Sequence, residues 1–372
     1  MSQIAIIGCG FVADLYLRSF QQFPDLQIDL VHDHNPERLA AFCAHWKLPG
    51  VDSLQEFLNR LKPGSIVVNL TNPSAHYEIN HACLSAGHHV YSEKPLALDM
   101  DHAQALYDLA RDKGLLLASA PCSVLSQTAQ TLAKAVRDQV AGVPRLVYAE
   151  LDDGFIPQAP YHKWHSESGA PWPFEDEFRT GCTLEHAGYY LSWLVGMFGP
   201  VARVVAASAA VIPDKEIATD TPDFSVATLF FASGMVARLT CSIVAPHDHQ
   251  IRVIGDKGVL SVKRAWDNAA PVRFHRRYRI RRRLIDQPLG RKLPLLGGSG
   301  KVKRRGAASM NFALGVAEMV AALRDGRDCR MSAEFALHIN EVVLAIQNAH
   351  SSDGVQRMQT SCAALQPTEW AK

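Results

Sequence analysis

Apolar runs and helical periodicity alternate through the first third of the chain. Short apolar runs of strand length occur at residues 4–7, 28–32, 65–70, 89–92 and 115–118. Segments with helical spacing lie between them, at about 14–20, 77–86 and 100–113. Gly87, at the end of one such segment, suits a helix C-cap. This order predicts a parallel sheet with right-handed crossovers, which binds ligands at the carboxyl ends of its strands.

The first strand leads into a glycine-rich turn. Residues 8–13 read Gly-Cys-Gly-Phe-Val-Ala, a G-x-G-x-x-A string between a strand and a helix, as in dinucleotide-binding turns. Gly8 would permit the tight turn and Gly10 the close approach of a pyrophosphate, while Ala13 is small enough for the helix to pack on the strand. The helix N-terminus would offer unpaired N–H groups to the phosphates. We therefore expect a doubly wound Rossmann domain that binds a nicotinamide dinucleotide.

A carboxylate at the end of the second strand bears on which dinucleotide binds. Asp33 is placed to accept hydrogen bonds from the adenosine ribose hydroxyls and to repel the 2′-phosphate of NADP. His34 and Asn35 follow it directly, where an arginine would favour NADP. We therefore expect NAD, with NADP as the alternative. The competing interpretation is an ordinary surface carboxylate in another α/β fold.

Two polar segments follow the third and fourth strands. Residues 71–76 read Thr-Asn-Pro-Ser-Ala-His, and residues 93–95 read Glu-Lys-Pro. Because the carboxyl ends of parallel strands lie at one edge of a sheet, both segments are expected to line one site. The residues expected to contact the dinucleotide are Gly8, Gly10, Phe11, Val12, Ala13, Asp33, Thr71, Asn72, Pro73, His76, Glu93, Lys94 and Pro121.

Composition narrows the classes of function. The chain has 372 residues, 48% hydrophobic and 20% charged, with a net charge of +1. It therefore suits two domains and has no general excess of charge for nucleic acid or a lipid surface. Its eight cysteines lack CxxC spacing, so we expect neither a disulfide framework nor a metal site. With no apolar run long enough to span a bilayer and no evident secretory signal, a cytoplasmic protein is expected.

Together these motifs resemble the Gfo/Idh/MocA family, which includes glucose–fructose oxidoreductase and inositol dehydrogenase. The resemblance rests on GCGFVA, TNPSAH and SEKP, on TGCTLEHAGYY at residues 180–190, on VIGDKG at 253–258 and on residues 311–346. It implies a dinucleotide-binding Rossmann domain, assigned here to residues 1–122, and an α+β domain, assigned to residues 123–372. In that second domain an open, mostly antiparallel sheet would cover the nicotinamide. A homodimer or homotetramer is also expected.

The second half of the sequence is compatible with such a domain. Strand-like runs occur at residues 204–211, 224–231, 235–243 and 250–254, with Gly234 at a hairpin-like turn. A last helix is expected at about residues 333–348, and it could return to the first domain.

The resemblance also points to the residue that moves the proton. In relatives the lysine of the Glu-Lys-Pro segment contacts the nicotinamide ribose and the substrate, which makes Lys94 the first candidate for catalysis. Burial beside a cofactor would lower the pKa of Lys94 and let it exchange a proton. An exposed lysine on a turn is the alternative.

The chain departs from the family on the helix that faces the substrate. Relatives usually carry Asp-x-Gly-x-His, whereas this chain has His186 and Tyr190 at the outer positions, four apart and so on one helical face. Tyr190 can serve as the acid/base, as in glucose–fructose oxidoreductase and dihydrodiol dehydrogenases. Three roles are open for His186: a second acid/base, a neutral hydrogen-bond donor to a substrate hydroxyl, or a core histidine whose hydrogen bonds are made within the protein. In a second departure, Pro121 and Cys122 stand where relatives often have Asn-x-Arg, and we expect Cys122 to be a small buried residue.

Two further segments offer candidate ligand contacts. In the proline- and aromatic-rich segment 157–180, Trp164 could stack on a sugar ring and Arg179 could bind a carboxylate or phosphate. A purely structural loop is the alternative. Residues 273–305 are rich in arginine and lysine. They form either an anion site, for example for a phosphorylated or nucleotide-linked sugar, or a solvated or oligomer-facing surface.

The sequence therefore predicts an NAD(P)-dependent oxidoreductase. A hydride would move between the nicotinamide and a carbon of a sugar, sugar derivative or cyclitol, and an anionic substrate is left open. Lys94 and Tyr190 would form the proton relay. The residues expected to contact the substrate are Lys94, Trp164, Arg179, His186 and Tyr190. The alternatives are an NAD-dependent glycosidase that oxidises its substrate transiently, and a non-catalytic dinucleotide-binding sensor.

Overall fold

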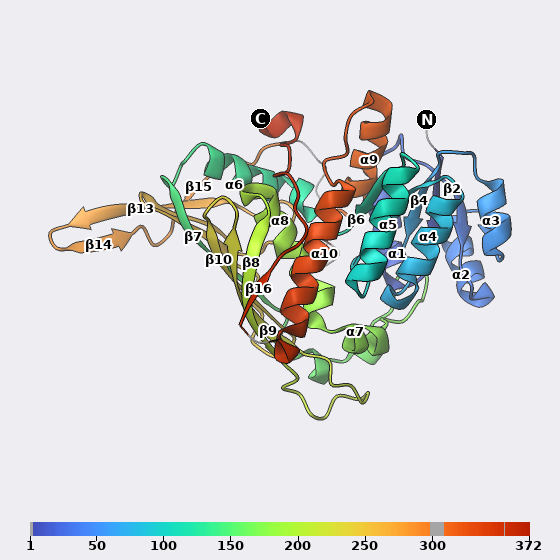
Figure 1. Ribbon diagram of the computed structural model, residues 1–372, viewed down its shortest axis with the longest axis horizontal. Coiled ribbons are helices and arrows are strands. Elements are labelled where there is room, and N and C mark those ends of the chain that lie inside the picture. The colour runs from blue at the N-terminus through green and yellow to red at the C-terminus, as the bar shows by residue number, and fades with distance from the viewer. Residues whose placement is uncertain (1–2, 298–308, 353) are drawn as a thin grey trace.

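Two sheets organise the chain in the computed structural model, which describes residues 3–297, 309–352 and 354–372 (Figure 1). The first sheet is built from the N-terminal third of the chain, and the second from the strands that follow. The arrangement confirms the expected fold class, a doubly wound parallel sheet joined to an α+β unit with a mostly antiparallel sheet.

The first sheet has six parallel strands in the order β3-β2-β1-β4-β5-β6. The strands are β1 (Ile4–Ile7), β2 (Ile28–His32), β3 (Gly50–Val51), β4 (Ile66–Asn69), β5 (His89–Ser92) and β6 (Leu117–Ser119). The apolar runs in the sequence located all of these strands except β3. The order in which successive strands are added to the sheet reverses between β1 and β4, and ligands of such sheets bind in the crevice at that point.

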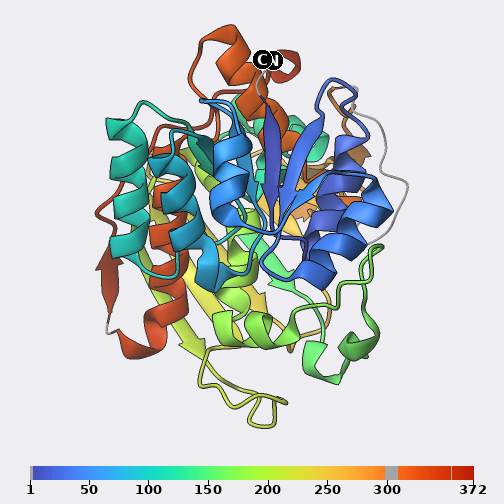
Figure 2. The same cartoon turned by 90° about the vertical axis from the view of Figure 1, so that its right-hand side faces the viewer.

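Alternate residues of the strands face two separate layers of helices, as the strand period requires. Ile6 packs in one cluster with Phe42 of α2, and Ile7 packs in another with Leu106 of α5. The helices of these layers are α1 (Phe11–Phe20), α2 (Pro36–Trp46), α3 (Leu54–Arg60), α4 (His76–Ser85) and α5 (Met100–Asp112). Figure 2 views this unit with its helices around the blue strands. The parallel strands are therefore buried on both sides, which accounts for their continuous apolar runs.

The second sheet has ten strands, and β15 pairs with β13 beside the main order β14-β13-β12-β11-β7-β10-β9-β8-β16. The pair β7–β10 is parallel and the other pairs are antiparallel. The strands are β7 (Pro144–Asp152), β8 (Val201–Ala209), β9 (Phe224–Phe231), β10 (Val236–Ser242), β11 (Ile251–Gly255), β12 (Gly258–Val262), β13 (Arg273–Ile280), β14 (Arg283–Asp286), β15 (Arg291–Lys292) and β16 (Val355–Arg357). The helices of this part are α6 (Gln127–Arg137), α7 (Phe174–Thr180) and α8 (Gly188–Phe198). The strand-like runs after residue 200 correspond to β8–β11.

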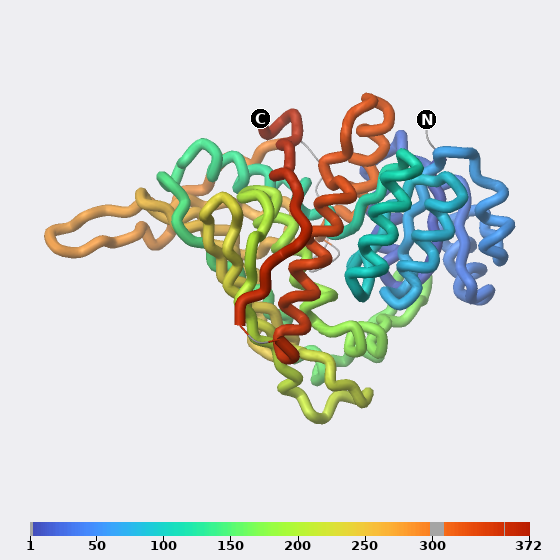
Figure 3. Tube along the Cα trace, viewed as in Figure 1, coloured from blue at the N-terminus to red at the C-terminus, as the bar shows by residue number. Residues whose placement is uncertain are grey.

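Two helices from the end of the chain return to the first sheet. They are α9 (Leu314–Asp325) and α10 (Ala333–Gln347). The last helix contacts α5 and β6 as well as β8, and the Asn340 side chain accepts a hydrogen bond from the Ala97 N–H at 3.2 Å. This helix thus packs against elements of both sheets. After α10 the trace runs back along the second sheet towards the C-terminus (Figure 3).

The arginine-rich segment begins as a β-hairpin. Strands β13 and β14 project from the end of the second sheet (Figure 1, left). The hairpin and the segment after it also expose apolar side chains, with Leu284 69% and Leu289 82% exposed. Residues 298–305 of the basic segment, which include Lys301, Lys303, Arg304 and Arg305, lie outside the described residues. Within the described ranges, no helix has the length and apolar character needed to cross a membrane.

Candidate active site

A cavity of about 380 Å³ lies between the glycine turn and the second sheet. Its volume is in the range typical of small-molecule sites. The first unit contributes Gly10, Phe11, Val12, Leu15, Leu70, Thr71, Asn72, Pro73, Glu93 and Lys94 to its wall. Polar and aromatic residues from the rest of the chain complete the wall, among them Asp153, Trp164, Trp172, Asp176, Glu177, Glu185, His186, Tyr189 and Trp266. The cavity therefore lies at the carboxyl ends of β1, β4 and β5, where the sequence predicted a site.

The two glycines of the turn have different surroundings. Gly8 has a φ of +99°, and a Cβ atom there would lie 2.6 Å from the backbone carbonyl of Leu70. Gly10 precedes α1 in an extended conformation, and no atom lies within 4 Å of the position that its Cβ would take. The N-terminus of α1 has no side-chain cap. Open space beside uncapped N–H groups is what an incoming pyrophosphate needs, so the turn fits a dinucleotide.

Asp33 is held by the backbone around the glycine turn. Its carboxylate accepts hydrogen bonds from the N–H groups of Cys9 at 2.7 Å and Asn35 at 2.8 Å, and the side chain is buried. It does not line the cavity described above. The structure thus places the carboxylate rigidly at the end of β2, and its contact with an adenosine ribose stays a prediction.

Three other residues expected to contact the dinucleotide are packed away from this cavity. Ala13 is fully buried beneath the turn. His76 is also fully buried, and its ring nitrogens lie 2.6 and 2.9 Å from the carbonyl oxygens of Pro95 and Thr71, so it ties the two polar segments together. Burial lowers the pKa of His76. Pro121 packs against Gly188 of α8, outside the cavity wall. These three side chains support the site from behind.

Lys94 forms an ion pair with Glu185 inside the cavity. The lysine side chain is 17% exposed and the glutamate 4%. Burial alone would lower the pKa of Lys94, but Glu185 and Glu177 outweigh burial and raise it above the ordinary lysine value. The expectation of a lowered pKa for Lys94 was therefore wrong, because a buried carboxylate lies beside the ammonium. In this structure Lys94 is a protonated donor held by a carboxylate.

A π-helical turn sets which residues of the next helix face the cavity. Residues Thr183–Ala187 form the π-turn, and α8 continues from it. Glu185, His186 and Tyr189 line the cavity. Tyr190 is 1% exposed, lies outside the cavity wall, and its hydroxyl has no hydrogen-bond partner among the described residues. The structure does not bring Tyr190 and His186 together on the cavity, because the wider turn breaks the regular four-residue spacing.

His186 faces a carboxylate that sequence analysis did not identify. Its Nδ1 lies 3.2 Å from Oδ2 of Asp153, which directly follows β7. Burial lowers the pKa of His186, which favours the neutral ring. Asp153, Glu177 and Glu185 carried no motif of their own in the sequence. A usable signal was the position of Glu185 inside the segment that resembles the family's substrate-facing helix.

The aromatic segment before α7 forms one side of the cavity. Trp164 and Trp172 both line it, with their ring centroids 5.1 Å apart. Trp164 therefore lines the candidate site, and its stacking on a sugar ring stays a prediction. Arg179 does not line the cavity: its side chain is 60% exposed and lies 3.9 Å from Glu175. An anion held by Arg179 in this cavity is not supported by the structure.

The cavity wall carries more negative than positive charge. Lys94 is the one lysine or arginine among the described residues of the wall. The carboxylates of the wall are Glu93, Asp153, Asp176, Glu177 and Glu185. Burial and the neighbouring Glu185 raise the pKa of Glu177, so this acid holds its proton more tightly than usual. Around Lys94, away from the glycine turn, the wall is therefore suited to neutral or cationic groups.

Two family models match the chain. One describes an oxidoreductase family with an NAD-binding Rossmann fold and matches residues 2–120, and the other describes the GFO/IDH/MocA C-terminal domain and matches residues 129–261. The chain belongs to this family. Membership in Gfo/Idh/MocA confirms the resemblance seen in the motifs, and it supports binding of a nicotinamide dinucleotide, NAD or NADP, by the Rossmann unit.

Named relatives of this Gfo/Idh/MocA protein act on sugars and cyclitols. UDP-N-acetylglucosamine 3-dehydrogenase of Acidithiobacillus ferrooxidans is 29% identical over 41% of this chain and 46% of its own length. A scyllo-inositol 2-dehydrogenase (NADP(+)) of Bacillus subtilis is 26% identical over 55% and 53%. These matches thus span about half the length of each relative. In fold, the WlbA dehydrogenase of Bordetella pertussis, solved with NADH and UDP-GlcNAcA, is similar with a TM-score of 0.71 at 18% identity, covering 96% of this chain and 98% of that one.

Proposed function

We propose that the protein is an NAD-dependent dehydrogenase that oxidises a secondary alcohol of a neutral sugar or cyclitol, reversibly. The observation that carries this proposal is the ion pair of Lys94 and Glu185 in the cavity that begins at the glycine turn. A dinucleotide bound there supplies the hydride acceptor. The chain itself has to hold the alcohol in place and move the hydroxyl proton.

The ion pair can perform the proton transfer. When an alcohol is oxidised, its carbon loses a hydride and its oxygen loses a proton. The Lys94 ammonium would donate a hydrogen bond to that oxygen and stabilise negative charge as it develops there. Glu185, in contact with Lys94, would accept the proton that leaves. In the reverse direction the same pair would return the proton to the carbonyl oxygen.

Other wall residues would position the substrate. His186 and Tyr189 follow Glu185 within four positions of the chain and line the same cavity, so they can form hydrogen bonds with ring hydroxyls. Trp164 and Trp172 provide apolar faces on which a sugar ring can stack. Tyr190 as the acid/base stays a prediction, and its buried hydroxyl would have to move to reach the cavity.

The charge of the wall supports a substrate without an anionic group at the reacting ring. With Lys94 as the cation of the described wall and carboxylates around it, a phosphate or carboxylate on the reacting ring, away from the glycine turn, would meet repulsion. Preference for NAD is supported by Asp33, whose fixed negative charge would repel the 2′-phosphate of NADP.

The test combines binding with turnover. NADH and NADPH would be titrated by fluorescence, and oxidation would then be followed on matched neutral and anionic compounds, such as myo-inositol with an inositol phosphate and N-acetylglucosamine with its UDP derivative. We expect NADH to bind more tightly and a neutral compound to be oxidised. Lys94→Met should abolish turnover, whereas Lys163→Met, on an exposed lysine outside the wall, should not. Preference for the anionic partner would refute the substrate class, and failure of both dinucleotides to bind would refute the whole proposal.

A further inference from the structure

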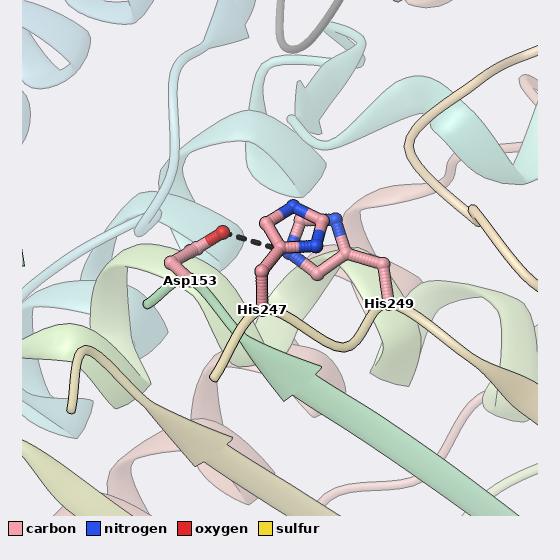
Figure 4. Close-up of side chains that lie close together, drawn as sticks. All are labelled: Asp153, His247 and His249. Carbon is pink, nitrogen blue, oxygen red and sulfur yellow. Dashed lines mark hydrogen bonds and ion pairs between the residues drawn. The ribbon is translucent and has the colours of Figure 1, made fainter. Parts of the chain in front are cut away.

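Two histidines and an aspartate converge at the edge of the cavity. Asp153 directly follows β7, and His247 and His249 lie on the segment between β10 and β11. Their side chains point towards one another from these two segments (Figure 4). One ligand atom from each lies within 4.8 Å of the others. The spacing of the cysteines predicted no metal site, and this cluster contains no cysteine.

The three side chains lie close enough to meet at one divalent ion, for which Asp153 and His249, now hydrogen-bonded to each other, would have to separate by about 0.6–0.8 Å. Oδ1 of Asp153 lies 2.7 Å from Nε2 of His249, and the rings of His247 and His249 are 4.0 Å apart at an angle of 38°. Ligands about 2.0–2.2 Å from a tetrahedral zinc ion are roughly 3.3–3.5 Å from each other. His247 is exposed, so rotation of its side chain can bring its nitrogen to that separation without disturbing the core.

A second observation concerns two buried polar atoms at the cluster, one on Asp153 and one on the neighbouring His186. Oδ2 of Asp153 and Nδ1 of His186 are both buried and have no hydrogen-bond partner among the described residues, although they lie 3.2 Å apart. The Asp153 side chain is 9% exposed. A buried carboxylate oxygen without a donor is costly to the folded protein, and a cation would satisfy it.

The surroundings also favour a cation at this position. The described wall of the cavity has several carboxylates and one ammonium, so it attracts positive charge. The ring of Trp266 packs 4.4 Å from the ring of His249 and restricts the movement of that imidazole. Imidazole nitrogens with one carboxylate oxygen form a ligand set that zinc and its neighbours in the first transition series accept.

We propose that Asp153, His247 and His249 bind one divalent transition-metal ion, of which zinc is the best fit. Asp153 also lines the cavity, so the fourth position of a tetrahedral ion is expected to open towards it, next to His186. If the proposed dehydrogenase function holds, on which this last step rests, a substrate hydroxyl oxygen could take that position. Binding of the ion itself does not depend on that function.

The test measures metal binding directly. Protein without an affinity tag would be stripped with a chelator, titrated with Zn²⁺ by calorimetry, and analysed for retained zinc after dialysis. We expect one zinc per chain and, with Co²⁺ in its place, the visible absorption of a tetrahedral site. His247→Ala changes an exposed side chain and should weaken binding by about tenfold or more, and Asp153→Asn should remove it. His102→Ala, on the exposed surface of α5, is the matched control and should bind zinc as the wild type does.

The outcomes separate this proposal from the proposed function. If the wild type retains no stoichiometric zinc, or if His247→Ala binds zinc as tightly as the wild type, the metal site is refuted. NADH titration of the chelator-treated protein tests the dinucleotide site independently. If the protein binds zinc but does not bind NADH, the proposed dehydrogenase function is refuted and the metal site is not.

Discussion

The two glycines of the turn should respond in opposite ways to the addition of one methyl group. Gly8→Ala is expected to damage the folded protein, and Gly10→Ala is expected to spare the fold and damage dinucleotide binding. Both changes are chemically identical and lie two positions apart, so each is the control for the other.

The magnitude for Gly8 follows from its surroundings. An alanine there would keep a φ near +99°, at a strain of about 1–3 kcal/mol. Its Cβ would also lie 2.6 Å from the carbonyl carbon and oxygen of Leu70, so β1 and β4 would have to move apart, at a further cost of about 1–3 kcal/mol. The sum, about 2–6 kcal/mol, is a large part of the stability of an ordinary protein. At about 2–4 °C per kcal/mol, we expect the melting temperature to fall by roughly 10 °C.

The magnitude for Gly10 is different. Its φ of −74° and ψ of −169° suit any residue, and the Cβ position is open. Replacing an N-cap glycine by alanine costs up to about 1 kcal/mol, so the melting temperature should move by no more than about 3 °C. The added methyl group would lie where the pyrophosphate approaches. We expect the Kd for NADH to rise by about tenfold or more, which corresponds to about 1.4 kcal/mol.

The assay is a pair of measurements on both variants. Thermal unfolding followed by circular dichroism gives the stability, and NADH fluorescence gives the Kd. If Gly10→Ala bound NADH like the wild type, the turn would not hold the pyrophosphate. If Gly10→Ala melted as low as Gly8→Ala, the distinction drawn from the two Cβ positions would be refuted.

Four further predictions address the ion pair, the buried acid, the paired tyrosines and the hairpin. Lys94→Ala should lower kcat by about 10²–10⁴ while the Kd for NADH changes by less than about threefold, and an unchanged kcat would remove this lysine from the chemistry. Burial raises the pKa of Glu177, so the folded chain keeps a proton that the unfolded chain releases above a pH of about 4–5. The contribution of Glu177 to stability therefore falls as the pH rises, and between acidic and alkaline pH the wild type should lose about 1–2 kcal/mol more in urea unfolding than Glu177→Gln does. Tyr189→Phe should raise KM or lower kcat and Tyr190→Phe should leave steady-state kinetics nearly unchanged, and the reverse result would show that the tyrosine chosen from the sequence is the acid/base. Leu284→Glu should shift the expected homodimer or homotetramer to smaller species in light scattering if the hairpin is part of the interface, and an unchanged mass would exclude that side chain from it.

The sequence alone was enough for the features that depend on near neighbours. The turn from Gly8 to Ala13 could be predicted because a strand, a tight turn and a helix start within a few residues impose their own steric demands. The buried strands of the first sheet could be located because both of their faces pack on helices, which leaves continuous apolar runs. The place of Lys94 followed from the rule that parallel strands bring their carboxyl ends to one edge.

The partners of those residues were decided by the tertiary structure. Lys94 and Glu185 are 91 positions apart, and the sign of the lysine's pKa shift depended on that contact. Consecutive residues of a helix point about 100° apart, and the π-turn before α8 changes which residues of that helix face the cavity. Tyr189 therefore lines the cavity and Tyr190 does not. Asp153 met His247 and His249 through the packing of β7 between β10 and β11. Sequence spacing carries no signal for such contacts, because they depend on how whole elements pack and not on the local preferences of the chain.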